Sequence, residues 1–467
     1  MKFPNLESDI CIIGSGPAGI TAALEIAKSK KSILLIEAGD FSPKDITPFE
    51  AEEHGIPTHL QAHRLRMFGG TSGHWAGWCS PLDASNFQAN SFENMWPISY
   101  EEMIPYYDEA SEYLNLHSFR ADQASHQRIN DKIGGKRFYF SSPVTRFGVQ
   151  FKNAILKSKH IRFLKQATLV DFSVDQDSRV QSAIVDIEGT RNQIKAKQYI
   201  LACGGIENAR LLLNFKKQNP NVFQEDGFYI GKGFMDHPHF YNVGRLISTG
   251  FNRILNKSLT DEYGQTHKHQ NFLQLSPEVR KEHDLLNSVL RIHDSAPESE
   301  FEEQMAQTLK NNLNEPWSSS KSLVFMTEQA YSADSSYVEL SANKDSFGLN
   351  KTKITWNLTE KDWDSYLRSI NLFKKEIEKQ NIGYVKINKT FLDRKAIPSA
   401  GPHHMGTTKM ASKRSKGVVN ENLASFSVPN LYVLGSSVFP RGGCANPTFT
   451  IVALAIRLAK HIEKTLS

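Results

Sequence analysis

The sequence lacks several features that mark particular protein classes. Its 467 residues include four scattered cysteines, Cys11, Cys79, Cys203 and Cys444, and no two of them form a C-x-x-C pair. This spacing predicts neither a metal site nor a dithiol redox centre. No run of about 18 apolar residues occurs, so no membrane span is predicted. The first residues pass from a short polar lead directly into an apolar run, so no signal peptide is predicted either.

The chain also has little net charge. Its 55 Lys and Arg residues against 50 Asp and Glu residues give a formal net charge of +5, and the charges are interspersed. Because nucleic-acid-binding proteins carry basic patches, this pattern argues against nucleic acid as a partner. The content of 39% apolar and 22% charged residues is typical of a folded globular chain. We expect a cytoplasmic protein with reduced cysteines; the alternative is export with a partner subunit that carries the signal.

The beginning of the chain predicts a βαβ unit. An apolar run from Asp9 to Ile13 is typical of a buried parallel strand, Ile20 to Ala27 has helical spacing, and Ser32 to Ile36 predicts a second strand. This order implies a parallel sheet. The whole chain is too long for one core, since domains are typically about 100–200 residues. We therefore expect at least two domains.

The turn between the first strand and the helix fits the dinucleotide pattern G-x-G-x-x-G. It consists of Gly14, Ser15, Gly16, Pro17, Ala18 and Gly19. Gly14 permits a tight turn, Gly16 lets the backbone approach a pyrophosphate, and Gly19 lets helix and strand pack closely. The helix N-terminus then faces the phosphates. Glu37, at the end of the second strand, can accept hydrogen bonds from a ribose and would repel the 2′-phosphate of NADP. The motif alone does not separate FAD from NAD.

The rest of the chain predicts further α/β elements near both termini. Two stretches give weaker signals: residues 85–150 have no clear period, and the polar residues 245–320 are interpreted as loops or a lid. We expect strands within Ile161 to Leu201, at Tyr337 to Leu340, Thr352 to Trp356 and Asn430 to Leu434, and helices at Glu207 to Leu213, Thr359 to Lys379 and Thr448 to Lys464.

Three later stretches accompany the glycine motif. They are Arg66 to Trp75 (RMFGGTSGHW), Cys203 to Arg210 (CGGIENAR), and His403 to Met410 (HHMGTTKM) with Asn430 to Val433 (NLYV) and Ala445 to Thr448 (ANPT). In this order they resemble the glucose–methanol–choline (GMC) oxidoreductase family, near its pyranose-oxidase-like bacterial branch. The segment from Asp334 to Leu340 also resembles a strand of that branch's substrate domain. The resemblance spans nearly the whole chain and is weakest in residues 85–150 and 245–320.

The resemblance implies an α/β fold (α+β in total) with two domains. A discontinuous FAD-binding Rossmann-like domain is expected at residues 1–84, 150–244 and 396–467. A substrate-binding domain with an antiparallel sheet is expected at residues 85–149 and 245–395. The family also implies hydride transfer from an alcohol carbon to flavin N5. The sequence holds no second G-x-G-x-x-G in a βαβ context and no C-x-x-x-x-C after the first helix, which disfavours disulfide reductases.

Several residues acquire roles through this resemblance. His403 is the implied base, with His404 as the alternative in register, and a neutral imidazole suits that role near neutral pH. Asn446 takes the second active-site position, where an amide can hold a hydroxyl but cannot act as a base. His74 aligns with a position that is covalently bonded to the flavin in some relatives and not in others, so FAD covalently linked through His74 and free FAD both stay open. The other implied cofactor contacts are Gly69, Gly70, Thr71, Gly435, Pro447 and Thr448, together with Asn446.

Other polar and aromatic residues have simpler interpretations. Glu207 and Arg210 are expected to form a surface or interdomain ion pair. Trp75, Trp78 and Trp96 could stack on a sugar, but we interpret them as core or interface residues because large aromatics are mostly buried.

The favoured function is FAD-dependent oxidation of an alcohol group, CH–OH, of a sugar or glycoside. One alternative is a non-redox lyase of the same family that keeps FAD structurally. Another is a binding or assembly subunit, against which the intact pair of His403 and Asn446 argues. The expected partners are a small alcohol or sugar substrate and an external electron acceptor, which is oxygen, a quinone or a redox protein. Oxidase and dehydrogenase are not distinguished.

Overall fold

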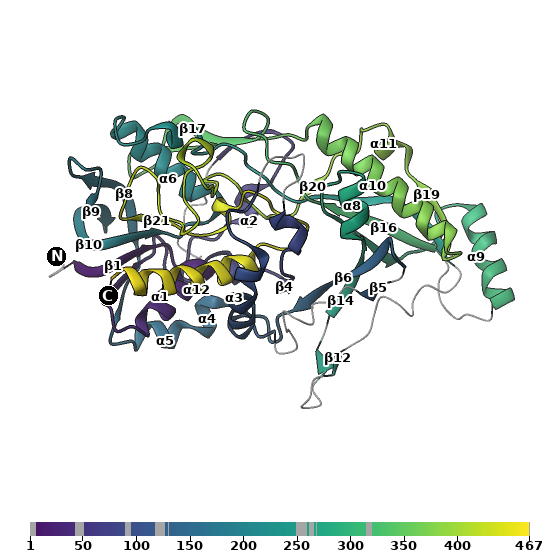
Figure 1. Cartoon of the computed structure of the whole chain (residues 1–467), viewed down its shortest axis with the longest axis horizontal. Helices are drawn as coiled ribbons and strands as arrows, with labels where there is room; N and C mark the ends of the chain where they lie inside the picture. Colours follow the sequence, from purple (N-terminus) through teal and green to yellow (C-terminus); the bar gives the residue numbers. More distant parts are fainter. Residues whose placement is uncertain are drawn as a thin grey trace.

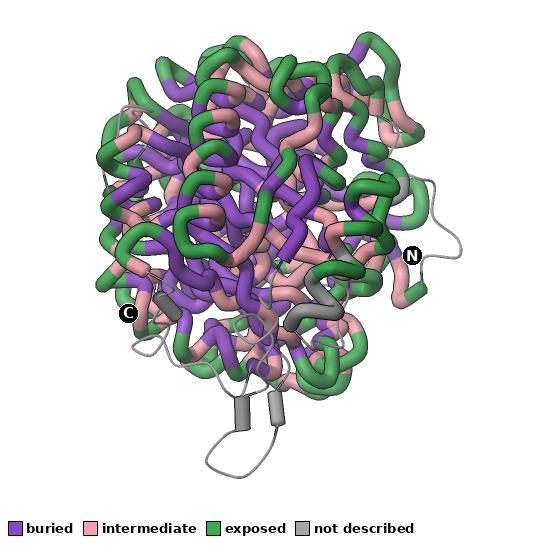
Figure 2. Tube along the Cα trace, turned by 90° about the vertical axis from the view of Figure 1, so that its right-hand side faces the viewer, coloured by how far each residue is buried: buried purple, intermediate pink, exposed green. Residues whose placement is uncertain are grey.

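The computed structural model describes most of the chain, and its elements form two large β-sheets toward opposite ends of the long axis (Figure 1). Buried residues fill the interior and exposed residues gather at the periphery (Figure 2). No helix within the described part is long and apolar enough to cross a membrane. The described residues are 6–42, 51–88, 95–116, 127–128, 130–248, 259–260, 266–267, 269–313 and 320–466.

The first sheet, called here the Rossmann-like sheet, has a parallel centre. Its strands are β1 (Glu7–Ile13), β2 (Ile33–Ile36), β7 (Ile161–Leu164), β8 (Ala167–Val174), β9 (Val180–Ile187), β10 (Thr190–Leu201) and β21 (Leu431–Val433). β1 lies between β2 and β10 and runs parallel to both, and β7 and β21 extend the parallel part. The first half of β10 pairs antiparallel with β9, which pairs with β8. Ile10 and Ile12 of β1 are fully buried, as expected for a central parallel strand.

Helices cover this sheet. α1 (Pro17–Ala27) and α12 (Thr448–Thr465) pack together, and α3 (Tyr100–Tyr113) lies against α12 (Figure 1). α6 (Gly204–Gln218) follows β10 and contacts β8. α1 begins at Pro17, whose fixed φ and missing N–H suit a first helical turn. In α12, residues 452–459 are all buried, so this part of the helix is enclosed by the protein on every side.

The second sheet, called here the antiparallel sheet, has the order β19-β11-β16-β15-β14-β6-β4, with β20 beside β11 and β5 beside β6. These strands are β4 (Trp78–Cys79), β5 (Gln127–Arg128), β6 (Ile133–Phe140), β11 (Pro238–Ser248), β14 (His269–Leu275), β15 (Ser288–Asp294), β16 (Ser320–Thr327), β19 (Gly383–Ile387) and β20 (Ser399–Ala400). α10 (Glu360–Lys379) packs Phe373 into one core with Leu290 and Phe325 of this sheet. Because side chains alternate along a strand, their neighbours Arg291 and Met326 project from the opposite face.

Shorter elements complete the fold. β3 (Ala51–Gly55), β17 (Tyr337–Lys344) and β18 (Asn350–Trp356) form a small sheet, and β12 (Leu259–Thr260) pairs with β13 (Thr266–His267). The remaining helical segments are α2 (Leu60–His63), η2 (Gly70–Gly73), η3 (Ala84–Phe87), α4 (Phe147–Gln150), α5 (Lys152–Leu156), η5 (Glu225–Phe228), α8 (Pro277–Glu282), α9 (Glu300–Leu313), α11 (Lys389–Leu392), η6 (Arg414–Lys416) and η7 (Ser436–Val438).

The predicted architecture, a Rossmann-like sheet plus a domain with an antiparallel sheet, is confirmed. The interpretation of residues 245–320 as loops or a lid is wrong for the described part, which forms β14, α8, β15, α9 and the end of β11. The segment has a polar composition because β14 buries polar side chains, such as Asn271 and Gln274, beside its apolar residues. Residues 85–150, which have no clear period, contain α3 and β6.

The predicted domain boundaries stay a prediction. Two strands pair in a different sheet from the one these boundaries imply. β4 belongs to the predicted FAD-binding segment 1–84 and β11 mostly to the segment 150–244, yet both pair within the antiparallel sheet. α3 lies within the predicted substrate-binding segment 85–149 but packs against α12.

Candidate active site

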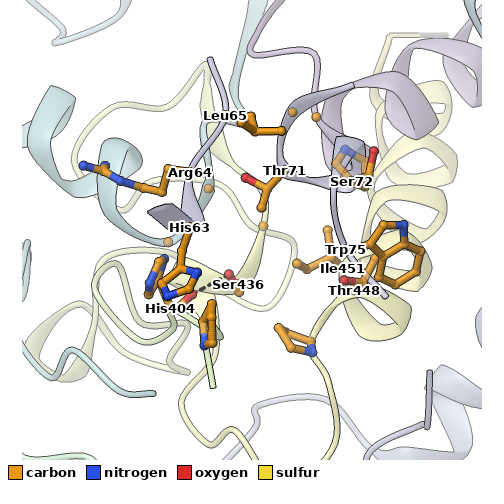
Figure 3. A pocket seen from close by; sticks show the side chains of 18 of the residues that line it. His63, Arg64, Leu65, Thr71, Ser72, Trp75, His404, Ser436, Thr448 and Ile451 are labelled. Atoms are coloured by element: carbon orange, nitrogen blue, oxygen red, sulfur yellow. Dashed lines mark hydrogen bonds between the residues drawn. The ribbon is translucent and has the colours of Figure 1, made fainter. Parts of the chain in front are cut away.

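A single cavity of about 660 Å³ connects the two sheets. At one end it is lined by the turn after β1 and the end of β2, which are carboxyl ends of parallel strands and the usual binding place in such sheets. At the other end it is lined by side chains from β11, β14, β15 and β16. Figure 3 shows part of this lining, with His63 and His404 close together and Trp75 away from them near the start of α12.

The glycine turn leaves open space above the N-terminus of α1. Gly14 has φ +100°, and a Cβ atom there would lie 2.6 Å from the carbonyl oxygen of Ala202, so only glycine fits. A Cβ atom on Gly16 would meet nothing within 4 Å, which leaves the backbone facing the cavity. Gly19 packs so closely that its Cβ atom would lie 1.9 Å from the carbonyl oxygen of Gly14. The turn thus presents an open helix N-terminus, which suits a phosphate group.

Glu37 is buried at the end of β2 and holds this turn. Its Oε2 accepts hydrogen bonds from the Ser15 backbone N–H at 3.1 Å and from the Ser15 hydroxyl at 2.7 Å. Its Oε1 accepts from the Gly39 N–H at 2.8 Å. Burial raises the pKa of Glu37, and these hydrogen bonds together with Arg66 oppose the rise. Glu37 lines the cavity, and its hydrogen bonds also orient the glycine turn. The sequence motif did not reveal this second role.

His403 lies between two polar side chains at the other end of the cavity. Its Nε2 is 2.8 Å from the amide nitrogen of Asn446, and its Nδ1 is 2.8 Å from Nδ1 of His237. An amide nitrogen only donates, so Nε2 of His403 is the acceptor, and the neutral ring carries its proton on Nδ1 and donates to His237. Burial, followed by the charges that His237, His239 and His404 would carry, holds the pKa of His403 well below its usual value.

The backbone before His403 is fixed by Asp236, which lies at the start of β11. Its Oδ1 accepts hydrogen bonds from the N–H groups of Gly401 and His403, both at 3.0 Å, and of His237 at 2.6 Å. Burial raises the pKa of Asp236 to about 7, and these hydrogen bonds oppose the rise. Sequence analysis missed Asp236, His237 and His239. A signal was present, since His237 and His239 flank Pro238, where β11 begins, and both rings lie near the ring of His403.

The antiparallel sheet supplies an aromatic wall. Trp78 stacks on Phe272 with ring centres 5.5 Å apart, and the guanidinium of Arg291 lies 5.1 Å from the first ring and 5.4 Å from the second. Two of the three tryptophans expected in the core or an interface, Trp75 and Trp78, line the cavity.

Comparisons with known proteins show what the chain is similar to. Residues 332–455 match the family model GMC oxidoreductase, and residues 9–47 match an FAD binding domain. Over these residues the chain is similar to the GMC oxidoreductase family. It is similar to the 2-methyl-1,2-propanediol dehydrogenase of Mycolicibacterium austroafricanum, with 22% identity over 99% of this chain and 96% of that protein. It is also similar to the fructose dehydrogenase large subunit of Gluconobacter japonicus, with 19% identity over 100% of this chain and 99% of the relative.

A solved structure agrees with the fold. The pyridoxine 4-oxidase from Mesorbium loti superimposes with a TM-score of 0.63 at 16% identity, covering 97% of this chain and 98% of that one. By these similarities, the chain is an FAD-dependent enzyme that acts on the CH–OH group of alcohols or sugars.

The backbone that lines the cavity has the open glycine turns that FAD requires. The open face of Gly16 and the helix N-terminus suit the pyrophosphate, and Gly70, whose Cβ atom would lie 3.1 Å from Cα of Gly16, brings a second glycine turn next to the first. Glu37 is available to a ribose along the same wall.

The structure places most of the predicted site residues around this one cavity. Those that line it are Gly14, Ser15, Gly16, Pro17, Ala18, Glu37, Gly70, Thr71, His74, His403, Gly435, Asn446, Pro447 and Thr448. Gly19 and Gly69 lie behind the lining. Gly19 packs α1 on the turn, and Gly69 packs against Gly148, which its Cβ atom would approach to 2.3 Å.

Two remaining expectations concern packing. Trp96 is buried in the core, as predicted. Glu207 and Arg210 do form an ion pair of 3.0 Å, but it is buried and not on the surface, and Arg64 joins it at 2.9 Å from Glu207. The two arginines hold the pKa of Glu207 below its usual value even though burial, the largest effect, raises it. This network anchors α6 to the segment that leads into η2.

Proposed function

We propose that this enzyme oxidises a hydroxyl group of a sugar or glycoside, as expected for the pyranose-oxidase-like branch of the family, with His403 as the base. The observation that carries the proposal is the unprotonated Nε2 of His403. It lies beside the amide of Asn446 in a cavity that also fits FAD. The similarity to a fructose dehydrogenase and the aromatic wall of Trp78 and Phe272 support a sugar.

Oxidation of an alcohol removes the hydroxyl proton and a hydride from the same carbon. FAD, when bound in the cavity, supplies the two-electron acceptor for that hydride. A substrate hydroxyl that replaced the direct contact between His403 and Asn446 would donate its hydrogen bond to Nε2 of His403 and accept one from Nδ2 of Asn446. His403 then takes the proton as it leaves, and Asn446 orients the oxygen.

His237 acts as a positioning residue in this scheme. Its Nδ1 accepts from Nδ1 of His403 and so keeps the reactive Nε2 of His403 unprotonated and turned toward Asn446. When His403 gains a proton, the same contact becomes a charge-assisted hydrogen bond and stabilises the imidazolium. Burial lowers the pKa of His237 to about 4, so His237 stays neutral and able to accept.

Anaerobic spectroscopy of the purified holoenzyme tests the function. A panel of pyranoses, glycosides and simple alcohols is added, and loss of the yellow flavin absorbance identifies a substrate. Readmitting air then separates an oxidase from a dehydrogenase that needs a quinone or a redox protein. Flavin that no compound of the panel bleaches, together with cleavage of any of them, would establish the lyase alternative and overturn the proposal.

The covalent link remains part of the proposal because His74 lines the cavity beside Thr71. Acid precipitation tests it. A covalent bond through His74 keeps the yellow colour in the pellet and His74→Ala releases it, whereas colour that stays in the supernatant of the wild type shows that FAD is not covalently held.

A further inference from the structure

Arg291 is a partly buried cation whose charge no acidic side chain of the described residues balances. It projects from β15 on the cavity face of the antiparallel sheet, next to Val324 of β16, and lines the cavity that holds His403. Its Nε atom is buried and has no hydrogen-bond partner in the described part of the structure. We propose that the substrate carries a carboxylate group, which Arg291 binds. This inference rests on the proposed function, because it concerns the substrate of the same cavity.

The guanidinium is held in place before any ligand arrives. Its central carbon lies 5.1 Å from the ring centre of Trp78 and 5.4 Å from that of Phe272, and cation–π contacts of this kind stabilise a cation at this position. A guanidinium presents paired N–H groups that match the two oxygens of a carboxylate.

The carboxylates that line the cavity lie at its other end. They are Glu37, which is bonded to the glycine turn, and Glu207, which is paired with Arg64 and Arg210. Around Arg291 the described lining is aromatic, aliphatic or histidine. Burial lowers the pKa of His239 to about 3, so His239 is neutral near pH 7. Arg291 thus gives this end of the cavity a net positive charge.

A partly buried cation without a partner loses some of its hydration, and an anion that binds it offsets that cost. One guanidinium among neutral groups matches a monoanion, whereas a phosphate dianion would require further cations or N–H donors. A carboxylate is therefore the fitting ligand chemistry.

The anion and the reacting alcohol can belong to one small molecule. The ring of His239 lies 6.1 Å from the ring of His403, and His239 also experiences the charge of Arg291, which contributes to its low pKa. His239 therefore lies near both groups. A sugar acid of the uronic or aldonic type, which has a carboxylate a few carbons from a secondary hydroxyl, has the required chemistry.

The test compares matched pairs of probes on the holoenzyme: glucose with glucuronate, galactose with galacturonate, and glycerol with glycerate. Flavin reduction is followed anaerobically, and equilibrium binding of all six compounds is measured by calorimetry. In the wild type at least one acid is expected to react or bind more tightly than its neutral partner. In Arg291→Gln its dissociation constant rises on the order of 10²-fold, as for loss of one member of a buried charge pair, while the neutral partner is little affected.

Two further variants separate charge recognition from damage to the fold. Arg291→Lys keeps the charge without the paired N–H groups and should bind the acid with intermediate affinity. Arg394→Gln removes one positive charge at an exposed ion pair with Glu360 and Asp364, outside the cavity, and should leave acid binding unchanged.

Three results would overturn the inference. The first is wild-type enzyme that prefers the neutral member of every pair, in which case the proposed alcohol oxidation still stands. The second is equal binding of the acids by wild type and Arg291→Gln. The third is a preference for glucose 6-phosphate over all three carboxylates. Acids that bind through Arg291 but leave the flavin oxidised would support the inference and count against the proposed oxidation of these compounds.

Discussion

Nδ1 of His403 lies 2.8 Å from Nδ1 of His237, and this contact leaves Nε2 as the ring nitrogen that faces Asn446. Two imidazoles can share one hydrogen bond in this way only if one Nδ1 carries a proton and the other does not. The accepting ring is therefore neutral. Because the amide nitrogen of Asn446 donates to Nε2 of His403, the proton of His403 is on Nδ1, and Nε2 is the unprotonated nitrogen that can act as a base. The roles of both histidines can be tested separately.

Replacement of the base should act on chemistry more than on binding. His403→Ala is expected to slow anaerobic flavin reduction by about 10²–10⁴-fold, the usual contribution of a general base. Substrate affinity should change much less, because Asn446 and the cavity wall remain. Stopped-flow reduction at saturating substrate measures the effect. A variant that is reduced at a near-normal rate would remove His403 from the mechanism, and His404→Ala would then be the next variant to measure.

The positioning role of His237 predicts a rescue by a specific side chain. His237→Leu removes the acceptor and should lower the rate of flavin reduction by about 10–100-fold, since a hydrogen bond to a charged group contributes about 1.5–3 kcal/mol. His237→Asn places an amide oxygen near the position of Nδ1 and should recover most of that loss. If His237 only packed against its neighbours, the ranking would be the opposite. Leucine is closer to histidine in volume than asparagine is, so His237→Leu would then keep more activity than His237→Asn.

The outcome for these residues shows what a single sequence can predict here. The first strands and helix of the Rossmann-like sheet were predictable because Ile10 and Ile12 lie in an unbroken apolar run, and because the glycines from Gly14 onward follow it directly. His403 and Asn446 were found through the resemblance, although 43 positions separate them and only folding brings them to 2.8 Å.

The antiparallel sheet was not predictable in the same way. Leu290 enters the core with α10, whereas its neighbour Arg291 lines the cavity, so β15 has a polar face inside the protein. A pattern that assumes polar residues to be exposed assigns such a strand to a loop. Asp236 was missed for a related reason, because its importance lies in the backbone N–H groups of Gly401 and His403, which are distant in sequence.

The low pKa of His403 predicts the pH dependence of the reaction. Burial, the largest cause, and the neighbouring histidines disfavour its charged form, so the folded pKa lies well below the ordinary value of 6.5. A base works when it is unprotonated, so activity should persist as pH falls through 6.5 and be lost only below it. The profile of kcat/KM for a neutral substrate, which does not titrate itself, measures this. Asp236, whose pKa burial raises to about 7, holds the His403 backbone, so Asp236→Asn is the control. An acid limb centred at or above 6.5 that persists in Asp236→Asn and is lost in His403→Ala would contradict the assignment.

The glycine turn offers a test of the FAD site that does not depend on substrate. Gly14 has φ +100° and a Cβ atom there would lie 2.6 Å from the carbonyl oxygen of Ala202, whereas Gly189, with φ +78° in the turn between β9 and β10, has nothing within 4 Å of its Cβ position. Gly14→Ala therefore combines backbone strain with a clash, and Gly189→Ala carries the strain alone. Strain of this kind costs about 1–3 kcal/mol.

Both variants should lose thermal stability, but only Gly14→Ala should also lose FAD, because its turn must shift away from β10 and thereby move the N–H groups of Gly16 and the start of α1. The flavin absorbance per protein and the rise in Tm on adding FAD report this directly. Stoichiometric FAD in Gly14→Ala, with the same FAD-dependent rise in Tm as Gly189→Ala, would show that the pyrophosphate does not bind at this turn.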